Sequence, residues 1–185
     1  MTMAGAGLAD LLAKQEITEV LYRIARGTDR GDPELFASGF HEDGEDWHGL
    51  ANGPVTNIVA NLGRSTLLLT QHALSNILIE LDGERARVET LFTSFHQRRG
   101  EDGQVWDETL RGRYLDLFER RVGTWKIARR VVVWDCSRVE PAAGSWFDLM
   151  RQRPGADDRF VFGRRDRSDM VYDFELPAEL RGDRP

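Results

Sequence analysis

The chain has 185 residues, which is enough for one domain with a hydrophobic core. Lys and Arg number 25 and Asp and Glu 31, so the net charge is −6, and this balance argues against nucleic acid or an anionic membrane as a main partner. The sequence shows no basic and apolar leader, and no apolar run approaches the about 20 residues that span a bilayer, so we expect a cytoplasmic protein. The single cysteine, Cys136, excludes an internal disulfide and is interpreted as a small strand residue.

Three helices are predicted in the first third of the chain. Apolar residues recur at helical spacing over residues 8–30, with charged residues between them. The segment DPELFASGF predicts a short second helix, because Asp32 is a good N-cap and Pro33 suits the first helical position. Apolar residues spaced by three and four predict a third helix over residues 55–62.

The stretch HEDGEDWH, residues 41–48, combines two histidines with four carboxylates. Its spacing matches no metal-binding motif, because His41 and His48 are not one helical turn apart and the alternating pattern of an EF-hand is absent. We interpret the stretch as an acidic turn that leads into a short strand, with Asp43 as a turn former and His41 in solvent. A site for a divalent metal is the alternative, and Trp47 and His48 could point into the protein.

From residue 71 the apolar period changes to two, which predicts two long hairpins. The strands QHALSNILIEL and ERARVETLFTSFHQRR flank an Asp-Gly turn, and QVWDETLRGRYLDLFERR and TWKIARRVVVWDCSR flank a Val-Gly turn. The expected fold is therefore α+β, with helices on one face of a strongly curved antiparallel sheet, a cone with an interior. Residues 1–138 would form this domain and residues 139–185 an extension that wraps it or a neighbouring subunit.

The turns also predict which strand residues lie opposite one another. Pairing Leu81 with Glu84 in the first hairpin places His72 opposite Thr93, on the face that carries Phe95. A single bulge would invert these assignments, because a slip of one residue turns every side chain to the other face.

In the second hairpin, Arg121 pairs with Thr124, and Asp116 then lies opposite Arg129 as a favourable charge pair. This register places Glu119 opposite Lys126. It also places Arg130 on a largely apolar face of the sheet, the face expected to carry Arg113, Leu115, Val132 and Trp134.

Three residues are candidates for catalysis from their chemistry. Asp29, at the end of the first helix, could orient the imidazole of His72 and make it a general base near neutral pH. Arg130 could stabilise an oxyanion or a leaving group. The alternatives are a turn aspartate, a core histidine and an arginine paired with an acid. Since the sequence has no P-loop, no G-x-G-x-x-G and no G-x-S-x-G, we expect no cofactor and no metal.

Four segments in this order resemble the SnoaL-like family of the NTF2-like superfamily: ITEVLYRIARGTDRGDPELFASGFHED, TQHALSN, LDGERARVETLFTSFH and GRYLDLFERRVGTWKIARRVVVWD. The resemblance covers roughly residues 8–138. Its relatives include scytalone dehydratase, bile-acid 7α-dehydratases and the hexachlorocyclohexane dehydrochlorinase. It implies the cone-shaped half-barrel and a homodimer or homotrimer.

The resemblance also implies cofactor-independent elimination by an Asp–His dyad, which matches Asp29 and His72, with Arg130 as the arginine of the last strand. Relatives carry a Tyr or Lys before the Asp to assist the leaving group, where this chain has Ile24. The expected function is therefore a lyase or dehydratase for a hydrophobic cyclic, aromatic or steroid-like molecule, with an isomerase or cyclase, an aldehyde-releasing retro-aldol lyase and a non-catalytic binding module as alternatives. The residues expected to bind the substrate are Tyr22, Trp47, His48, Phe92, Phe95, Tyr114 and Trp134.

Overall fold

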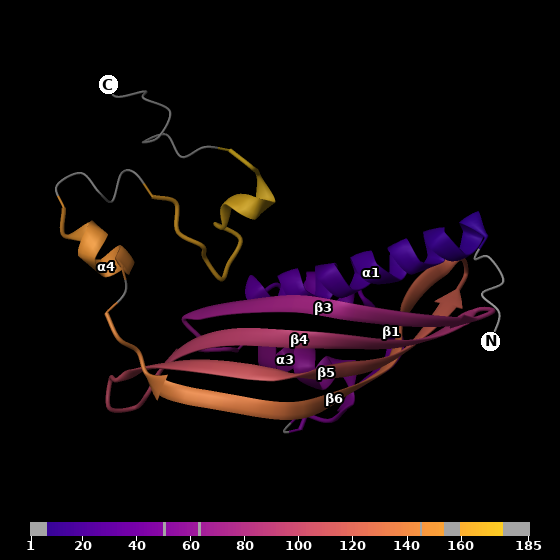
Figure 1. Cartoon of the computed structure of the whole chain (residues 1–185), viewed down its shortest axis with the longest axis horizontal. Helices are drawn as coiled ribbons and strands as arrows, with labels where there is room; N and C mark the ends of the chain where they lie inside the picture. Colours follow the sequence, from indigo (N-terminus) through magenta and orange to yellow (C-terminus); the bar gives the residue numbers. More distant parts are fainter. Residues whose placement is uncertain (1–6, 50, 63, 145, 154–159, 176–185) are drawn as a thin grey trace.

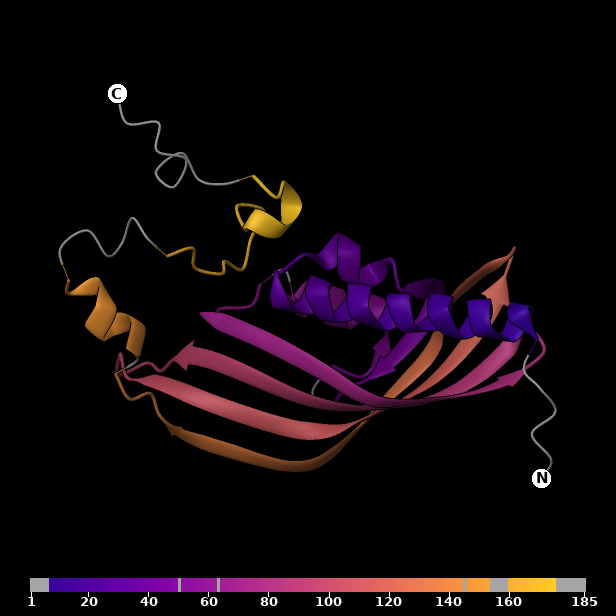
Figure 2. The ribbon, with the colours of Figure 1, turned by 45° about the horizontal axis from the view of Figure 1, so that its top comes forward.

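The computed structural model describes residues 7–49, 51–62, 64–144, 146–153 and 160–175. Helices cover the concave face of one strongly curved sheet that does not close on itself (Figures 1 and 2). The fold is thus the expected α+β half-barrel. No helix among the described residues is both long and apolar enough to cross a membrane.

The three predicted helices are present at the predicted positions. They are α1 (Leu8–Asp29), α2 (Pro33–Ala37) and α3 (Val55–Leu62). Asp32 caps α2 as expected, since its Oδ1 accepts a hydrogen bond of 3.0 Å from the backbone N–H of Leu35. Each of these helices follows from local sequence, namely apolar periodicity in α1 and α3 and the Asp-Pro start in α2.

The sheet has six strands in the order β2-β1-β6-β5-β4-β3. Their bounds are β1 Phe40–Trp47, β2 Gly53–Pro54, β3 Leu69–Asp82, β4 Arg85–Arg99, β5 Val105–Arg121 and β6 Thr124–Pro141. Neighbouring strands are antiparallel except β1, which runs parallel to β6. A further short helix, α4 (Trp146–Arg151), and a 3-10 turn, Met170–Tyr172, follow the sheet.

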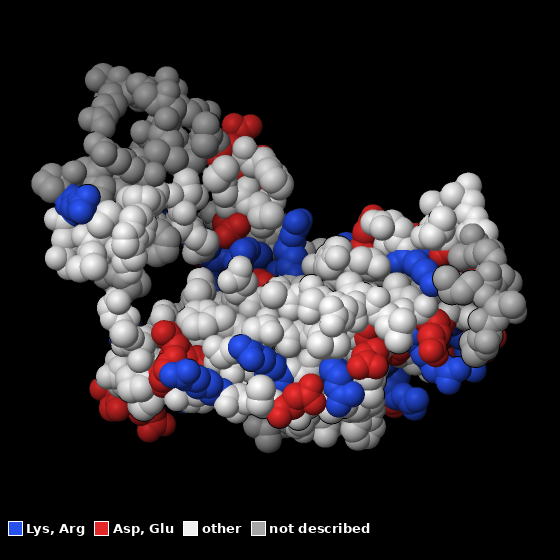
Figure 3. All heavy atoms as spheres, viewed as in Figure 1, with Lys and Arg blue, Asp and Glu red and all other residues white. Residues whose placement is uncertain are grey.

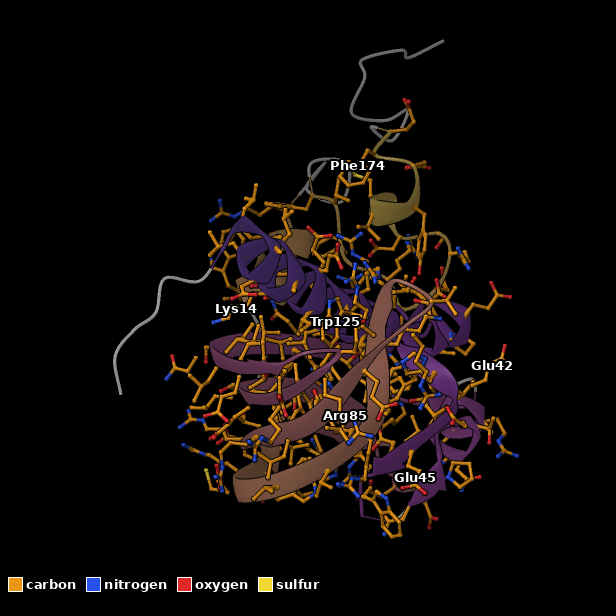
Figure 4. All side chains as sticks on the ribbon, turned by 90° about the vertical axis from the view of Figure 1, so that its right-hand side faces the viewer. Lys14, Glu42, Glu45, Arg85, Trp125 and Phe174 are labelled. Atoms are coloured by element: carbon orange, nitrogen blue, oxygen red, sulfur yellow. The ribbon has the colours of Figure 1, made fainter. Side chains whose placement is uncertain are left out.

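The main hydrophobic core lies between α1 and the sheet. Ile17 and Leu21 of α1 pack with Phe118 of β5 and Ile127 of β6, and all four side chains are buried. Trp125, at the start of β6, lies beneath α1 in the same core (Figure 4). Burial of this apolar stripe fixes α1 across the sheet, and so it also fixes where the end of α1 meets β3.

The first hairpin has a different register from the one predicted. Asp82 pairs with Arg85, so the turn residues are Gly83 and Glu84, and His72 lies opposite Ser94 instead of Thr93. The ladder is also irregular between Ser75 and Leu78, next to Asn76, which has a φ of 46°.

This change of register decides which residues of β4 share a face with His72. The face carries Phe92, Ser94 and His96, and Phe95 points to the other side of the sheet. The expectation that His72 and Phe95 share a face was therefore wrong.

The second hairpin begins as predicted, with Arg121 opposite Thr124 and Glu119 opposite Lys126. A bulge between Leu117 and Phe118 then shifts the ladder by one residue. As a result Asp116 lies opposite Arg130, where Arg129 was predicted. The neighbours predicted for Arg130 on its face of the sheet change too. Leu115 and Arg113 lie on the opposite face, while Tyr114 lies on the same face as Arg130.

In the stretch HEDGEDWH, residues 41–47 belong to strand β1 and His48 directly follows it, so the predicted turn is absent. His41 is buried, and its Nε2 lies 2.9 Å from the carbonyl oxygen of Glu119. The expectation of a solvated histidine was therefore wrong. Asp43 is a strand residue paired with Arg121 at 2.6 Å. Glu42 and Glu45 point outward from β1 (Figure 4).

Residues 160–175 return from the sheet to the C-terminal end of α1 (Figure 2). The Tyr172 hydroxyl donates a hydrogen bond of 2.8 Å to Asp32 Oδ2, and Asp32 also pairs with Arg167 at 3.2 Å. Arg30 pairs with Asp169 at 3.5 Å. These contacts attach the C-terminal segment to the junction of α1 and α2.

Candidate active site

A cavity of about 210 Å³ lies between α1, α3 and the concave face of the sheet. Apolar atoms make up most of the exposed surface of its wall, and they include the side chains of Leu21 and Ile24 of α1, Ile58 and Leu62 of α3, and Leu74 of β3. Ten lining residues also carry a polar group. They are Thr28, His48, Asn61, Ser65, Thr70, His72, His96, Tyr114, Arg130 and Arg165. A mostly apolar cavity with a few convergent polar groups is typical of a small-molecule site.

Asp29 and His72 are in direct contact at this cavity. Asp29 Oδ1 lies 2.7 Å from Nδ1 of His72, and Asp29 Oδ2 accepts a hydrogen bond of 2.9 Å from the backbone N–H of the same residue. The Thr70 hydroxyl donates to the main-chain carbonyl of Asp29 at 3.3 Å, which ties the end of α1 to β3. Both side chains are mostly buried, with exposed fractions of 11% for Asp29 and 10% for His72.

This geometry determines the tautomer of His72. A carboxylate only accepts hydrogen bonds, so Nδ1 carries the proton, and in the neutral ring Nε2 then presents its lone pair. No hydrogen bond joins Nε2 to any described residue. A histidine held in this way has an available base in the wall of an apolar cavity.

His96, which the sequence analysis did not single out, lies beside His72. Their ring centroids are 5.5 Å apart. Burial, followed by repulsion from the protonated form of His72, lowers the pKa of His96 from 6.5 to about 4, so the His96 ring is neutral at pH 7. Its Nε2 is buried without a partner among the described residues, which leaves it available to a ligand or a water molecule. Sequence reasoning missed His96 because the predicted register placed it on the opposite face of β4.

Arg130 also lines the cavity, but its charge is already balanced. Its Nε and Nη2 donate to Asp116 at 2.8 and 2.7 Å, and the side chains of Arg130 and Asp116 are 4% and 0% exposed. The guanidinium also stacks over the Tyr114 ring at 4.1 Å. Burial opposes the charge of Arg130, but Asp116 keeps the pKa of Arg130 above its usual range. Burial raises the pKa of Asp116, and the charge of Arg130 opposes that shift.

Tyr114 presents a hydroxyl in the cavity wall that makes no hydrogen bond to a described residue. Burial raises the pKa of Tyr114 above its usual range, so this hydroxyl keeps its proton. The Phe92 ring stacks on the Tyr114 ring, with centroids 4.4 Å apart. Tyr114 is therefore a fixed hydrogen-bond donor.

Only some of the residues expected to bind the substrate line the cavity. His48 and Tyr114 line the cavity. Phe92 packs behind Tyr114, and Trp134 lies edge-on against both Phe92 and His48. Neither Phe92 nor Trp134 lines the cavity itself, and the other three expected residues do not line it either: Tyr22 and Trp47 are exposed, and Phe95 points to the other face of the sheet.

His48 belongs to a second His–carboxylate pair. Its Nδ1 lies 3.3 Å from Oδ1 of Asp46, a residue that is 1% exposed and whose Oδ2 has no partner among the described residues. His48 follows β1, while His72 lies on β3 at the far edge of the sheet, so the curvature of the sheet brings both to one cavity. Within the described ranges, no three His, Cys, Asp or Glu side chains are arranged to hold a metal ion.

Ile24 occupies the cavity wall and is buried. An aliphatic side chain can neither donate a proton nor stabilise a leaving group. Any acid at this site therefore comes from another residue, and Tyr114 and His48 are the cavity residues with suitable chemistry.

The sequence profile of the SnoaL-like domain matches residues 9–131. The chain belongs to the SnoaL-like family. The match contains α1 to α3, the first five strands and the first part of β6, and with them both members of the Asp29–His72 pair. Among curated proteins, none matches this sequence significantly.

Several solved structures share this fold. A putative scytalone dehydratase from Novosphingobium aromaticivorans is 24% identical, with a TM-score of 0.61 over 70% of this chain and 88% of that chain. A hexachlorocyclohexane dehydrochlorinase, LinA type 2, is 20% identical, with a TM-score of 0.63 over 76% of this chain and 95% of that chain. A protein of unknown function from Mycobacterium tuberculosis is 22% identical, with a TM-score of 0.57 over 71% of this chain and 78% of that chain. At these identities the likeness shows the fold.

Proposed function

We propose that this SnoaL-like protein is a cofactor-independent lyase of the dehydratase type that acts on a hydrophobic cyclic molecule, with His72 as the general base. The observation that carries the proposal is the Asp29–His72 contact of 2.7 Å in the wall of an apolar cavity. It gives a mostly buried base that has a defined tautomer in its neutral form. The dehydratase and dehydrochlorinase names of two proteins that share the fold are consistent with it.

In the proposed reaction, Nε2 of His72 removes a proton from a carbon atom of the substrate. The electron pair of the broken C–H bond forms a C=C bond, and the neighbouring C–O bond breaks. The departing hydroxide takes up the proton held on Nε2 of His72 and leaves as water, which restores the neutral base. Asp29 stabilises the imidazolium that forms, because its carboxylate already accepts the Nδ1–H. The Tyr114 hydroxyl would donate a hydrogen bond to the departing oxygen. The Arg130 guanidinium, which is stacked on the Tyr114 ring, would support this role.

The size of the cavity narrows the class of substrate. An apolar cavity of about 150 Å³ takes up benzene. A cavity of about 210 Å³ therefore suits a substituted single ring or a compact pair of rings better than a four-ring steroid. The polar groups around it favour a ring that carries hydroxyl or carbonyl oxygens.

Ile24 favours a second candidate reaction at the same base. The Ile24 side chain supplies no acid beside Asp29. A reaction in which no leaving group departs does not require such an acid. Isomerisation through an enol, or retro-aldol release of an aldehyde, both begin with proton removal by His72. These reactions differ from dehydration in their products.

The test is to incubate the purified protein with a panel of hydroxylated aromatic and steroid compounds and to analyse products by mass spectrometry. Loss of water identifies dehydration, loss of an aldehyde identifies retro-aldol cleavage, and a new compound of unchanged mass identifies isomerisation. His72→Gln should lower turnover of any substrate by about 10² to 10⁴ fold. Binding without turnover of any compound would instead indicate a binding module, and full activity of His72→Gln would disprove the role of His72.

A further inference from the structure

The C-terminal segment, which lies outside residues 9–131, contributes one side chain to the cavity wall. This side chain is Arg165. Its Nε donates to the Thr70 hydroxyl at 3.1 Å, its Nη1 to the Ser65 hydroxyl and the Leu67 carbonyl at 3.2 Å each, and its Nη2 to the Thr28 carbonyl at 3.2 Å. The guanidinium is thus held beside the end of α1 and the start of β3, next to Asp29.

The acceptors around Arg165 are all neutral oxygens. No carboxylate of a described residue lies within 4.0 Å of its guanidinium, whereas the nearby Arg30 and Arg167 are paired with Asp169 and Asp32. Figure 3 shows Lys and Arg side chains gathered where the C-terminal segment meets the rest of the molecule. Burial lowers the pKa of Arg165, and the charge of Asp29 opposes this effect. Arg165 is therefore a partly buried cation without a neutralising partner of its own, which is costly unless an anion completes the site.

The guanidinium also has a donor to spare. It carries five N–H groups. The four hydrogen bonds to described residues leave one N–H of Nη2 for a ligand. An arginine that is fixed by neutral acceptors and keeps a free donor is suited to bind an oxyanion.

The segment is closely fitted to the body of the protein at this point. Gly31 has a φ of 59°, and a Cβ atom there would lie 2.9 Å from the carbonyl oxygen of Arg165. The backbone of Arg165 therefore lies directly against the turn that follows α1. With the Arg30–Asp169 and Tyr172–Asp32 contacts on the same segment, this packing fixes the position of the guanidinium.

We propose that Arg165 is a substrate-binding residue that recognises an anionic oxygen, a carboxylate or phenolate, on the cyclic substrate. The proposal deepens the proposed function and rests on it for the location of the site. An anion bound there balances the charge of Arg165 and places the ring in the apolar part of the cavity, within reach of His72. The C-terminal segment thereby determines which ring compounds the cavity accepts.

The test compares two probes that share a ring system and differ in charge, 2-naphthoate and 2-naphthamide. Their dissociation constants are measured by isothermal titration calorimetry on the full chain. The wild-type protein should bind 2-naphthoate about tenfold or more tightly than 2-naphthamide, the contribution of one charge-assisted hydrogen bond. Arg165→Gln should bring the two constants to within about twofold, and Arg165→Lys should keep a preference for 2-naphthoate because it keeps the charge.

Arg164→Gln is the matched control, because the neighbouring Arg164 side chain is exposed. It should leave the ratio of the two constants unchanged, and circular dichroism should show that each variant is folded. The proposal is overturned if the wild-type protein shows no preference or binds neither probe. It is also overturned if Arg165→Gln weakens both probes equally, which would indicate a purely structural clamp. Since the ratio needs no turnover, an inactive protein with an Arg165-dependent ratio would disprove the proposed function alone.

Discussion

Two largely buried pairs of a carboxylate and a nitrogen base each place the base, His72 or Arg130, in the wall of the same cavity, and they use their hydrogen-bonding groups differently. Asp116 and Arg130 are almost fully buried and joined by two hydrogen bonds of 2.8 and 2.7 Å. Asp29 and His72 are joined by a single side-chain contact of 2.7 Å, and Nε2 of His72 has no partner among the described residues.

This difference in satisfied hydrogen-bonding groups indicates which pair is structural and which pair can react. The Asp116–Arg130 pair directs both charges at each other and stacks on Tyr114, so its charge is already satisfied. In the Asp29–His72 pair, the second oxygen of Asp29 accepts a backbone N–H, which fixes the carboxylate and leaves the far nitrogen of the ring available. Breaking the first pair should cost stability, and breaking the second should cost activity.

The largest expected effect is on activity, from Asp29→Asn. Both oxygens of Asp29 accept hydrogen bonds, but an asparagine has only one oxygen, so its NH₂ group must face a donor or force Nδ1 of His72 to become the acceptor. The proton then moves to Nε2, and the base is lost. With a substrate from the panel, kcat should fall by about 10² to 10⁴ fold. A change confined to KM would contradict the role of Asp29.

The next effect is on stability, from Asp116→Ala, which leaves Arg130 buried and unpaired. The free energy of unfolding, measured with urea, should fall by about 3–5 kcal/mol. The double variant Asp116→Leu/Arg130→Met should recover much of this loss, because it removes both buried charges together. A loss below about 1 kcal/mol in the single variant would show that water reaches the pair.

His96 links stability to pH. Its pKa is about 4 in the folded protein and near 6.5 in a solvated chain, so the unfolded chain takes up a proton first as pH falls. The contribution that neutral His96 makes to the free energy of unfolding above pH 6.5 should therefore be lost as the pH decreases from about 6.5 to about 4. The loss from this residue should be about 2 kcal/mol, less than the full shift implies because the ring is not fully buried.

His96→Gln cannot take up this proton, so its urea unfolding free energy should decline less than that of the wild-type protein over the same pH range. Parallel declines in the two proteins would show that His96 does not stay neutral in the folded state.

The smallest expected effect is at the surface, from Asp43→Asn. Asp43 and Arg121 are joined at 2.6 Å, as close as the buried pairs, but their side chains are 69% and 41% exposed. Water screens such a pair, so stability should change by less than about 1 kcal/mol and activity should be unchanged. A larger loss would show that distance outweighs burial in this protein, contrary to the comparison above.

Much of the fold follows from local sequence. The helices α1, α2 and α3 are present where apolar periodicity and the Asp-Pro start predict them, and the second hairpin begins at the predicted Val-Gly turn. These features depend on residues within a few positions of one another, so a single segment contains the information.

The faces of the strands do not follow from local sequence. Irregularities after Ser75 and after Leu117 shift the ladders, and each shift turns the following residues to the other face. This is why His96 was missed, and why Arg130 lies opposite Asp116 when Arg129 was predicted there. A bulge depends on how a strand fits its neighbours in a curved sheet, and the strand's own composition does not reveal it.

By itself, the sequence determined the order of helices and strands, and its resemblance to a family pointed to Asp29 and His72 as partners although they are 43 positions apart. Only the tertiary structure decided that these two residues touch, that His96 lies beside them and that Arg165 of the C-terminal segment enters the same wall. It also decided that HEDGEDWH is a strand in which Asp46 is buried and His48 reaches the cavity. The physical reason is that secondary structure depends on short-range spacing, while a site depends on curvature, register and burial, which arise when distant segments pack together.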